Sequence, residues 1–355
     1  MKNLEKYRGL LKKGEVDGLL LTSETNRFYA AEFNVSEGVA LLTQETCYYF
    51  TDSRYIEVAE KNLPDFTVQM VDREHTYTQR INDAVAAHEL KTLGFEENYL
   101  TYAEYLYYSK NLNAKLEPYQ KPISAFRDIK EPWEMDYMRK AQEITDKTFT
   151  EMCAIIKPGM TEKELAAELI YRLSVNGADG PAFDPIVVTG ANTSMPHGVP
   201  GDTVVKEGDF ITLDFGAKYR GYCSDMTRTV AVGYATEEMK TVYNTVLQAQ
   251  EAALAITKAG VPGKDIDAMA RKVIADAGYG QYFGHGYGHG LGVEIHENPS
   301  PSPSNPNPIP AGAVCSAEPG IYLPDKFGVR IEDSVIFTED GYENLTHSPK
   351  HLIIL

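Results

Sequence analysis

The chain has 355 residues, 43% of them hydrophobic, and a chain of this length favours two domains over one. Its formal net charge of -17 makes nucleic acid and anionic membrane surfaces unfavourable partners. The sequence contains no apolar run of about 18 residues, so it predicts no membrane-spanning helix. It also has no signal-peptide core near its start and no CxxC pair, which predicts a cytoplasmic protein without disulfides.

Short apolar runs alternate with helical patterns along residues 1–122. The pattern near the start is an amphipathic helix whose apolar face carries Leu4, Tyr7, Leu10 and Leu11. Strands are predicted at residues 17–23, 38–43, 47–52, 66–71 and 92–98, and further helices at residues 56–63, 78–88 and 102–112. Alternation of this kind is typical of an α/β domain.

A linker is predicted at residues 123–131, before a second domain at residues 132–355. Pro132 suits the first turn of a long helix, because proline lacks the backbone N–H that this turn leaves unpaired. Residues 157–177 resemble residues 258–278, and each copy has a Lys-x-Gly turn followed by a helix that ends in glycine. Two related halves predict an α+β domain with a pseudo-twofold repeat and a cleft between the halves.

Residues 298–312 are rich in proline and serine. Proline is excluded from central strands and helix interiors, so we expect an extended loop between two strands. A docking site for a partner that recognises proline motifs is the alternative.

A first pair of acids lies in residues 209–230, where apolar and polar residues alternate. Asp214 falls on the face of its strand opposite the aliphatic side chains, and Asp225 lies on the next strand. If the hairpin closes near Tyr219 and Arg220, the two acids lie opposite each other, with Cβ atoms about 4.5–5.5 Å apart. Facing carboxylates repel each other, and one or two cations would relieve the repulsion. Two exposed acids on a solvated hairpin are the alternative.

Histidine and glycine are concentrated in residues 283–297, which contain His285, His289 and His296. Glycine lets the backbone approach a ligand closely, and imidazole is a common metal ligand and acid–base group. The cluster therefore predicts a functional site, with structural histidines as the alternative. The HExxH zinc motif is absent, because Pro299 breaks the helix that this motif requires.

Two further acids follow apolar strands. One strand ends at Glu318, and an acid at the end of a core strand needs a partner. Residues 328–337 are predicted to form one strand, with Arg330 and Glu332 on one face and Asp333 on the other. A simple salt bridge between the arginine and a carboxylate is the alternative for this segment.

Acids on apolar strands together with one histidine cluster predict a metal centre. Oxygen-rich ligation with a single imidazole suits a pair of Mn²⁺, Co²⁺ or Zn²⁺ ions. Two ions about 3.5–4 Å apart can activate a bridging water and polarise a carbonyl group, which predicts a hydrolase.

In these motifs, residues 130–355 resemble the pita-bread metallopeptidases, which include methionine aminopeptidase, aminopeptidase P and prolidase. Residues 1–122 resemble the N-terminal domain of the aminopeptidase P, prolidase and creatinase branch. The resemblance implies two divalent metal ions, with manganese as the expected metal and cobalt or zinc as alternatives. The metal ligands that it implies are Asp214, Asp225, His289, Glu318 and Glu332. Asp225 and Glu332 would bridge the two ions.

The resemblance also implies roles for residues around the metals. His197 and His296 would contact the substrate or the intermediate, and Glu318 would shuttle a proton. The residues that would bind the substrate and shape a proline pocket are Phe183, His285, Tyr322 and Arg330. Two positions depart from the family pattern. Tyr287 stands where a small hydroxyl residue is expected, and Ser316 stands where threonine is usual. Both departures bear on loop shape and substrate preference.

The function implied by the resemblance is that of an exopeptidase, a homodimer that cuts the bond between an N-terminal residue and proline. Dipeptides and longer peptides with a free N-terminus both fit the sequence. A methionine aminopeptidase-like enzyme is one alternative, and the additional N-terminal domain argues against it. A metal-free creatinase-type amidinohydrolase and a non-enzymatic peptide-binding relative are further alternatives, against which the five intact ligand positions argue.

Overall fold

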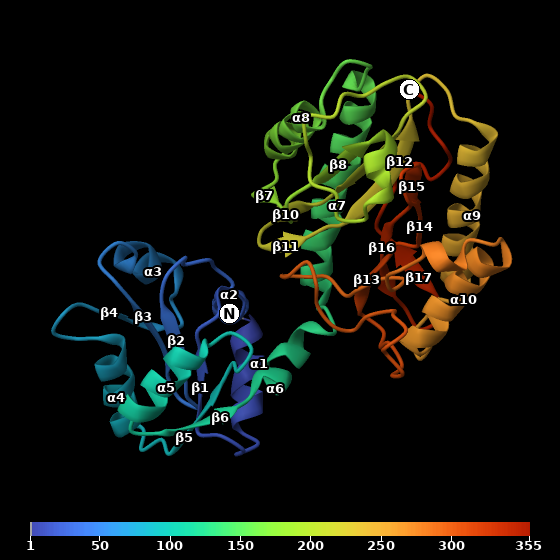
Figure 1. Cartoon of the computed structure of the whole chain (residues 1–355). Helices are drawn as coiled ribbons and strands as arrows, with labels where there is room; N and C mark the ends of the chain where they lie inside the picture. The colour runs from blue at the N-terminus through green and yellow to red at the C-terminus, as the bar shows by residue number, and fades with distance from the viewer. Residues whose placement is uncertain (1) are drawn as a thin grey trace. The chain divides into compact units, whose positions relative to one another are not determined.

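A computed structural model describes residues 2–355, which fold into two compact units (Figure 1). The first unit ends at Phe126, and the second unit is Arg127–Leu355. Among residues 2–355, no helix combines the length and the apolar character that a membrane span requires.

The first unit is built on a mixed six-stranded sheet with strand order β4-β3-β2-β1-β5-β6. Neighbours β1, β2 and β3 pair antiparallel, whereas the pairs β3–β4, β1–β5 and β5–β6 are parallel. The strands are β1 (Gly18–Leu21), β2 (Val39–Leu42), β3 (Cys47–Thr51), β4 (Thr67–Met70), β5 (Thr92–Phe95) and β6 (Lys115–Pro118). The helices are α1 (Lys2–Leu11), α2 (Glu24–Ala31), α3 (Ile56–Asn62), α4 (Tyr77–Ala87), α5 (Tyr102–Asn111), α6 (Gln120–Ser124) and the 3₁₀ turn η1 (Ala125–Arg127).

The predicted α/β character of this unit is confirmed, since every predicted strand and helix is present. Four elements were not predicted, namely α2, β6, α6 and the 3₁₀ turn η1. Helix α2 buries the polar residues Asn26 and Arg27, so it shows no apolar stripe. The side chain of Ser23 caps this helix, and the buried carboxylate of Glu96 accepts hydrogen bonds from both Ser23 and Asn26.

The second unit contains two long helices, each followed by a shorter one: α7 (Pro132–Ile155) with α8 (Glu162–Val175), and α9 (Glu237–Leu254) with α10 (Gly263–Asp276). The shorter helices start at Glu162 and Gly263, which are 101 residues apart, as the internal repeat predicts. The turns before them use Gly159 and Gly260 at φ of 96° and 86°, a left-handed conformation that favours glycine. Pro132 occupies the first turn of α7, as expected.

Short sheets line the inner side of the second unit. One sheet consists of β8 (Ile186–Thr189), β9 (Phe210–Phe215) and β12 (Met226–Ala231), and a second consists of β7 (Gly180–Pro181), β10 (Ala217–Tyr219) and β11 (Tyr222–Cys223). A third consists of β13 (Val314–Ala317), β16 (Asp333–Phe337) and β17 (Tyr342–Asn344). A fourth pairs β14 (Gly320–Leu323) with β15 (Phe327–Arg330). The 3₁₀ turns are η2 (Gly190–Ser194) and η3 (Gly280–Tyr282). Residues 298–312 contain no helix or named strand, in agreement with the predicted loop.

Two predictions about the strands were wrong. Residues 328–337 form two strands rather than one, because the chain leaves the ladder at Ile331 and Glu332. Asp214 pairs with Thr227 rather than with Asp225. The hairpin tip is a two-residue turn in which Arg220 and Gly221 both have positive φ, 47° and 81°. The predicted turn was near Tyr219 and Arg220, so the hairpin closes later along the chain than predicted.

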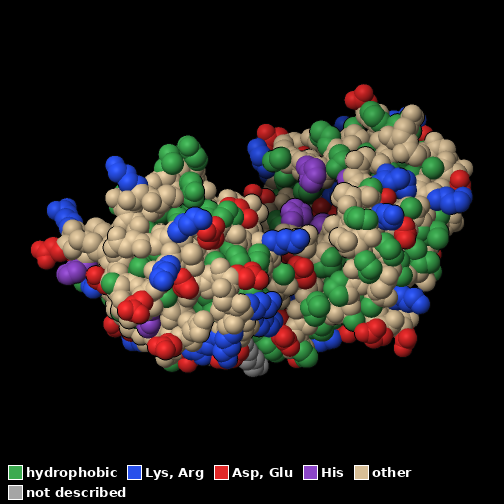
Figure 2. All heavy atoms as spheres, turned by 90° about the horizontal axis from the view of Figure 1, so that it is seen from below, with side chains coloured by type: hydrophobic (Ala, Val, Ile, Leu, Met, Phe, Trp, Pro, Cys, Tyr) green, Lys and Arg blue, Asp and Glu red, His purple; other side chains and the backbone are tan. Residues whose placement is uncertain are grey.

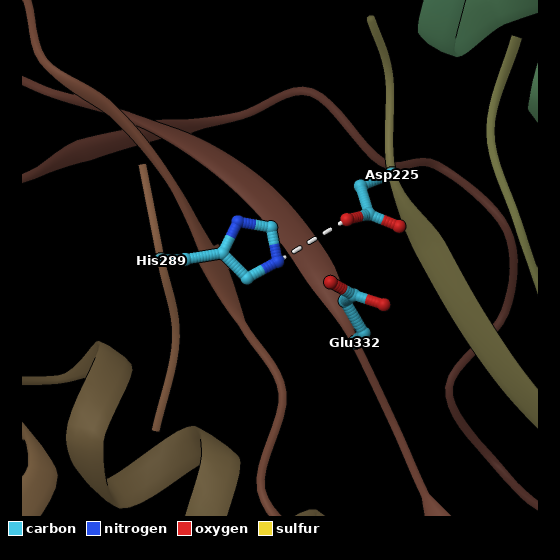
Figure 3. A group of neighbouring side chains, drawn as sticks. All are labelled: Asp225, His289 and Glu332. Carbon is cyan, nitrogen blue, oxygen red and sulfur yellow. Dashed lines mark ion pairs between the residues drawn. The ribbon is translucent and has the colours of Figure 1, made fainter. Parts of the chain in front are cut away.

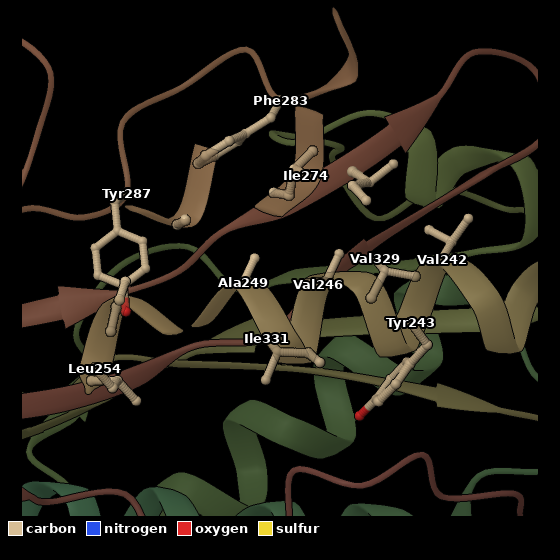
Figure 4. Packing of buried hydrophobic residues seen from close by; sticks show 14 of the residues in the cluster. Val242, Tyr243, Val246, Ala249, Leu254, Ile274, Phe283, Tyr287, Val329 and Ile331 are labelled. Carbon is tan, nitrogen blue, oxygen red and sulfur yellow. The ribbon is translucent and has the colours of Figure 1, made fainter. Parts of the chain in front are cut away.

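Helix α9 buries its apolar face against strands of the second half (Figure 4). Val242, Val246 and Ala249 of this helix share a buried cluster with Val329 and Ile331. In the first half, alternate residues of β9 pack into a separate cluster with α7 and α8, namely Ile211, Leu213 and Phe215. The opposite face of β9, which carries Asp214, is therefore left for polar contacts.

A close backbone approach holds the hairpin between the two aspartates. A Cβ atom at Gly216 would lie 1.8 Å from the carbonyl oxygen of Ser224. Across the same step, the backbone N–H of Ser224 donates to the carbonyl of Ala217 at 2.9 Å. Only glycine fits where the two strands come this close.

Gly216→Ala is therefore expected to lower the free energy of unfolding by about 1–3 kcal/mol, because the strands must separate to admit a methyl group. Urea denaturation of both proteins measures the loss. Gly180→Ala in strand β7 is the matched control, since nothing lies within 4 Å of its Cβ position. An equal loss in the two variants would contradict this explanation.

Candidate metal centre

A cavity of about 350 Å³ in the second unit gathers most of the residues that the sequence singled out. Its walls combine acids and histidines from distant parts of the chain with the apolar side chains of Ile186 and Ile295. A space-filling view shows histidine side chains close together on one face of the molecule (Figure 2). The predicted site residues that line the cavity are Phe183, His197, Asp214, Asp225, His285, His289, His296, Glu318, Arg330 and Glu332.

The acids lie in or beside strands whose inner sides face the cavity. Asp214 belongs to β9, and Asp225 directly precedes β12. Glu318 lies between β13 and β14, and Glu332 lies in the break between β15 and β16. The backbone N–H of Glu332 donates to the carbonyl of Thr227 at 3.0 Å, and the Thr227 hydroxyl donates to Glu332 Oε2 at 2.7 Å. The break is thus anchored to β12.

Asp225, His289 and Glu332 form a compact group with the donor types of a metal site (Figure 3). Their potential ligand atoms all lie within 4.8 Å of one another. His289 Nε2 lies 3.4 Å from Asp225 Oδ2 and 3.3 Å from Glu318 Oε1. The other ring nitrogen, Nδ1, lies 3.1 Å from the carbonyl oxygen of Gly290. A carbonyl partner for Nδ1 orients Nε2 toward the carboxylates, as in a metal-binding histidine.

The protein interior disfavours the charged forms of Asp214, Asp225 and Glu332. Burial raises the pKa of Asp225 to about 7, although its contact with His289 acts in the opposite direction. Burial and the charge of Asp225 raise the pKa of Glu332, and burial also raises the pKa of Asp214. Burial acts to lower the pKa of His289, but Asp225 and Glu318 together raise it to about 9. The acidic side chains outnumber the one imidazole among them. When they ionise, a bound cation can balance the excess negative charge.

Unpartnered oxygen atoms mark the place for such a cation. Among the described side chains, Asp225 Oδ1 and Glu332 Oε1 are buried without a hydrogen-bond partner. A buried carboxylate oxygen costs free energy unless it is compensated. Oxygen donors with one imidazole match the preferences of divalent ions such as Mn²⁺ and Zn²⁺. The residues present therefore fit the metal ions that the sequence implies.

Arg330 holds Asp214 at the edge of this group. Its Nη2 donates to Asp214 Oδ2, and its Nη1 donates to the Tyr322 hydroxyl at 2.8 Å. The salt bridge between the arginine and a carboxylate that was considered as the alternative for this segment exists, and its acid is Asp214. Tyr322 is not among the residues that line the cavity, yet its hydroxyl also lies 2.9 Å from His285 Nε2. These hydrogen bonds make a rigid wall on one side of the cavity.

The glycine-rich segment bends so that His289 and His296 meet. An extended chain would separate them by roughly 23 Å at about 3.3 Å per residue. Their ring centroids are instead 4.5 Å apart. Gly290 and Glu297 exchange two backbone hydrogen bonds, of 3.1 and 2.7 Å, which close the bend. The bend therefore brings both histidines to the same cavity.

The two departures from the family pattern have defined places. Tyr287 packs in the core, and its hydroxyl donates to the carbonyl of Gln250 at 3.2 Å, away from the cavity lining. Ser316 Oγ accepts the backbone N–H of His289 at 3.0 Å and donates to Glu318 Oε1 at 3.1 Å. A serine hydroxyl thus links a histidine and an acid of the site without the methyl group of threonine.

Sequence reasoning missed several residues of the cavity wall. Ile186, Ile295 and Ser302 line the cavity, but isolated apolar or hydroxyl residues give no local signal of a site. Thr227, which holds Glu332, could have been found. It lies two residues after Asp225, and alternate residues of a strand share one face.

Buried acids beside an imidazole, with further histidines in one cavity, are the features of a metal-dependent hydrolase. Comparison with known proteins agrees with this class. Residues 136–339 match Metallopeptidase family M24, and residues 3–129 match the Creatinase/Prolidase N-terminal domain. The chain belongs to metallopeptidase family M24.

Relatives match over nearly the whole chain. The uncharacterized peptidase YqhT of Bacillus subtilis (strain 168) is 42% identical, over 99% of each chain. The structure of an Xaa-Pro dipeptidase from Bacillus anthracis has a TM-score of 0.95 and 39% identity, and covers 100% of this chain and 99% of that one. The structure of an X-Pro aminopeptidase from Thermotoga maritima MSB8 has a TM-score of 0.94 and 38% identity, over 99% of each chain.

The raised pKa of Asp225 predicts how the metal-free protein responds to pH. The pKa in the folded state is about 7, above the value of about 3.9 for an unfolded aspartate, so the folded state binds more protons between these values. This contribution to stability is complete below about pH 4 and is lost as the pH rises through about 7. The thermal midpoint of chelated protein should therefore fall between pH 6 and pH 8.

Asp225→Asn is expected to reduce this fall, because an amide does not ionise. Added Mn²⁺ should stabilise the wild type at pH 8, by about 2.7 kcal/mol at a concentration of about 100 times Kd, and should stabilise the variant far less. Differential scanning fluorimetry with and without Mn²⁺ measures both effects. The same pH slope and the same Mn²⁺ shift in both proteins would contradict the assignment.

Proposed function

We propose that this protein is an exopeptidase that hydrolyses the bond between an N-terminal residue and proline. The observation that carries the proposal is the group of Asp225, His289 and Glu332, with two unpartnered carboxylate oxygens in a cavity lined by histidines and apolar side chains. The names of the two structural relatives, an Xaa-Pro dipeptidase and an X-Pro aminopeptidase, support proline in the second position of the substrate.

Two divalent ions would be held by Asp214, Asp225, His289, Glu318 and Glu332. Asp225 and Glu332 would each offer a carboxylate oxygen that has no hydrogen-bond partner. Bound ions would lower the pKa of a water molecule and polarise the scissile carbonyl. We propose Mn²⁺ as the metal, with Co²⁺ and Zn²⁺ as alternatives that suit the same donors.

Glu318 is the residue that we assign to proton transfer. Its Oε1 lies 3.3 Å from His289 Nε2 and accepts the Ser316 hydroxyl at 3.1 Å, so the carboxylate is fixed at the cavity wall. The carboxylate would accept a proton from the attacking water and donate it to the proline nitrogen as the peptide bond breaks. Proline would then leave with a neutral amine.

His197 and His296 are assigned to the developing oxyanion. Both line the cavity, and His296 lies beside His289. Burial, reinforced by the neighbouring His289, lowers the pKa of His296, so its ring is a neutral N–H donor at neutral pH. Donors that are already in place stabilise the charge that appears on the carbonyl oxygen in the transition state.

The proline ring is assigned to the wall of Phe183, His285 and Arg330, with Tyr322 as the residue that holds the last two in place. Phe183 supplies an aromatic surface. The Tyr322 hydroxyl connects His285 and Arg330 through contacts of 2.9 and 2.8 Å, which keeps the other side chains in place. A rigid wall can select a ring of one size by its fit.

The free amine of the substrate would be attracted by the excess acids of the site.

Dipeptidase and aminopeptidase activities both agree with this arrangement, and rates for Ala-Pro and Ala-Pro-Ala after Mn²⁺ reconstitution separate them. Hydrolysis of Met-Ala-Ser would favour the methionine aminopeptidase alternative, and binding without hydrolysis would favour a non-enzymatic relative. We also propose that the enzyme is a homodimer in the cytoplasm.

Substrates with proline are expected to be cut faster than substrates with alanine in the second position. A mismatch of about one methylene group in an apolar pocket changes kcat/KM by roughly 10–200-fold. Initial rates for Ala-Pro-Ala and Ala-Ala-Ala, with the same Mn²⁺-loaded protein, measure the ratio. Equal rates would support a broader aminopeptidase instead.

His289→Ala and His296→Ala are expected to separate a metal ligand from a catalytic donor. His289→Ala should lower both metal content and turnover. His296→Ala should keep about two metal equivalents and its thermal midpoint, while kcat falls by about 10²–10³-fold, the usual cost of one oxyanion donor. Metal analysis and kcat are measured on the same preparations. If His296→Ala loses metal as readily as His289→Ala, the two roles are wrongly assigned.

A further inference from the structure

Two cations at the start of the second unit reach a buried carboxylate next to His296. Arg127 Nε lies 3.0 Å from Glu297 Oε1, and Lys130 Nζ lies 3.2 Å from Glu297 Oε2. The side chains of Arg127, Lys130 and Glu297 are 6%, 1% and 2% exposed. Breaking a buried pair of this kind leaves an uncompensated charge, so the three groups hold one another firmly.

Glu297 closes the turn that carries His296. Its Oε1 accepts the backbone N–H of Glu294 at 3.0 Å, and its backbone exchanges two hydrogen bonds with Gly290. Arg127 reaches the same turn a second time, because its Nη2 pairs with Glu294. Both ends of the turn are therefore fixed to the segment that precedes α7.

A glycine makes room for this arrangement. A Cβ atom at Gly292 would lie 2.6 Å from Glu297 Oε2 and 2.9 Å from Lys130 Cε. The backbone N–H of Lys130 also donates to the carbonyl of Gly312 at 2.9 Å, so the lysine is fixed through its main chain as well. The ion pair thus lies in a space shaped for it.

His296 itself is exposed, although its ring lines the cavity. The ring contacts His289, with ring centroids 4.5 Å apart, and its direction depends further on the backbone turn that carries it. That turn is held by the buried charges of Arg127, Lys130 and Glu297. The neighbouring residue Ile295 lines the cavity too and moves with the same turn.

We propose that Arg127 and Lys130 act through Glu297 as positioning residues for His296. The proposal rests on the proposed function, in which His296 donates to the oxyanion. With the charge of Glu297 removed, Lys130 loses this carboxylate partner and Arg127 is left with Glu294, so the turn relaxes. A misplacement of about 1 Å can cost up to about 10²-fold in rate. The ion pairs thus position a catalytic side chain in addition to stabilising the fold.

Glu297→Gln is the first test, because the amide keeps the shape and removes the charge. We expect kcat on Ala-Pro-Ala to fall roughly 10–100-fold while KM and the two metal equivalents are retained. In a His296→Ala background the same change should have no further effect on kcat, because the side chain through which Glu297 acts is absent. Glu151→Gln, which breaks an ion pair with Arg172 between α7 and α8, is the control and should leave kcat unchanged.

A second variant and a second readout keep the test decisive. Lys130→Met removes one cation without removing the carboxylate, and it should give the same pattern if Glu297→Gln fails to fold. Histidine ring resonances of the metal-free protein, assigned with His296→Ala, should shift at His296 and stay unchanged at His88 of the first unit. This readout needs no substrate, so it stands even if no Xaa-Pro peptide is cleaved and the proposed function fails.

Any of the following results would overturn the proposal. The first is unchanged kcat in both Glu297→Gln and Lys130→Met. The second is a fold-loss in kcat for Glu297→Gln or Lys130→Met that multiplies with the fold-loss in kcat for His296→Ala. Such a result would show that Glu297 acts independently of the histidine. The third is an unchanged His296 resonance, or a loss of metal that accounts for the loss of rate.

Discussion

Repulsion among buried carboxylates is the constraint on which the second unit depends. Asp214, Asp225, Glu318 and Glu332 reach one cavity, and burial raises the pKa of Asp214, Asp225 and Glu332. A fold can hold such groups together only if other contacts fix their positions and a cation balances their charge. The hydrogen bonds of Arg330 and Thr227 fix the positions, and the unpartnered oxygens of Asp225 and Glu332 leave the charge for metal ions.

The internal repeat explains how the acids can be held so rigidly. Asp214 and Asp225 come from the first half, and Glu318 and Glu332 come from the second. Each half has its own apolar cluster beneath its strands, so each presents its acids from a fixed surface. Contacts between the halves then set the distances, above all the one from Arg330 to Asp214. A cavity between two cores can remain polar without weakening either of them.

The features of this structure that could be predicted from the sequence are those that produce a local pattern of residue types. Strands and helices with an apolar period were found, and the acids and histidines of the cavity were named from their motifs. Helix α2 was missed because it buries Asn26 and Arg27, which show no such period. The hairpin register was missed because Arg220, a residue other than glycine, adopts positive φ in the turn. The ion pair of Glu297 with Lys130 joins segments too far apart in the chain for any local pattern to link them.

The two-residue turn after Tyr219 restricts how this hairpin can change during evolution. Side chains alternate between the faces of a strand, so a single residue inserted within the paired part turns every later side chain to the other face unless a bulge or a longer turn absorbs it. Two inserted residues only lengthen the ribbon and leave Asp225 facing the cavity. Among chains that keep the metal centre, the length of this hairpin is therefore free to vary in steps of two. An odd difference requires a longer turn or a bulge between Gly216 and Asp225, and without either it would turn the second aspartate away from the cavity.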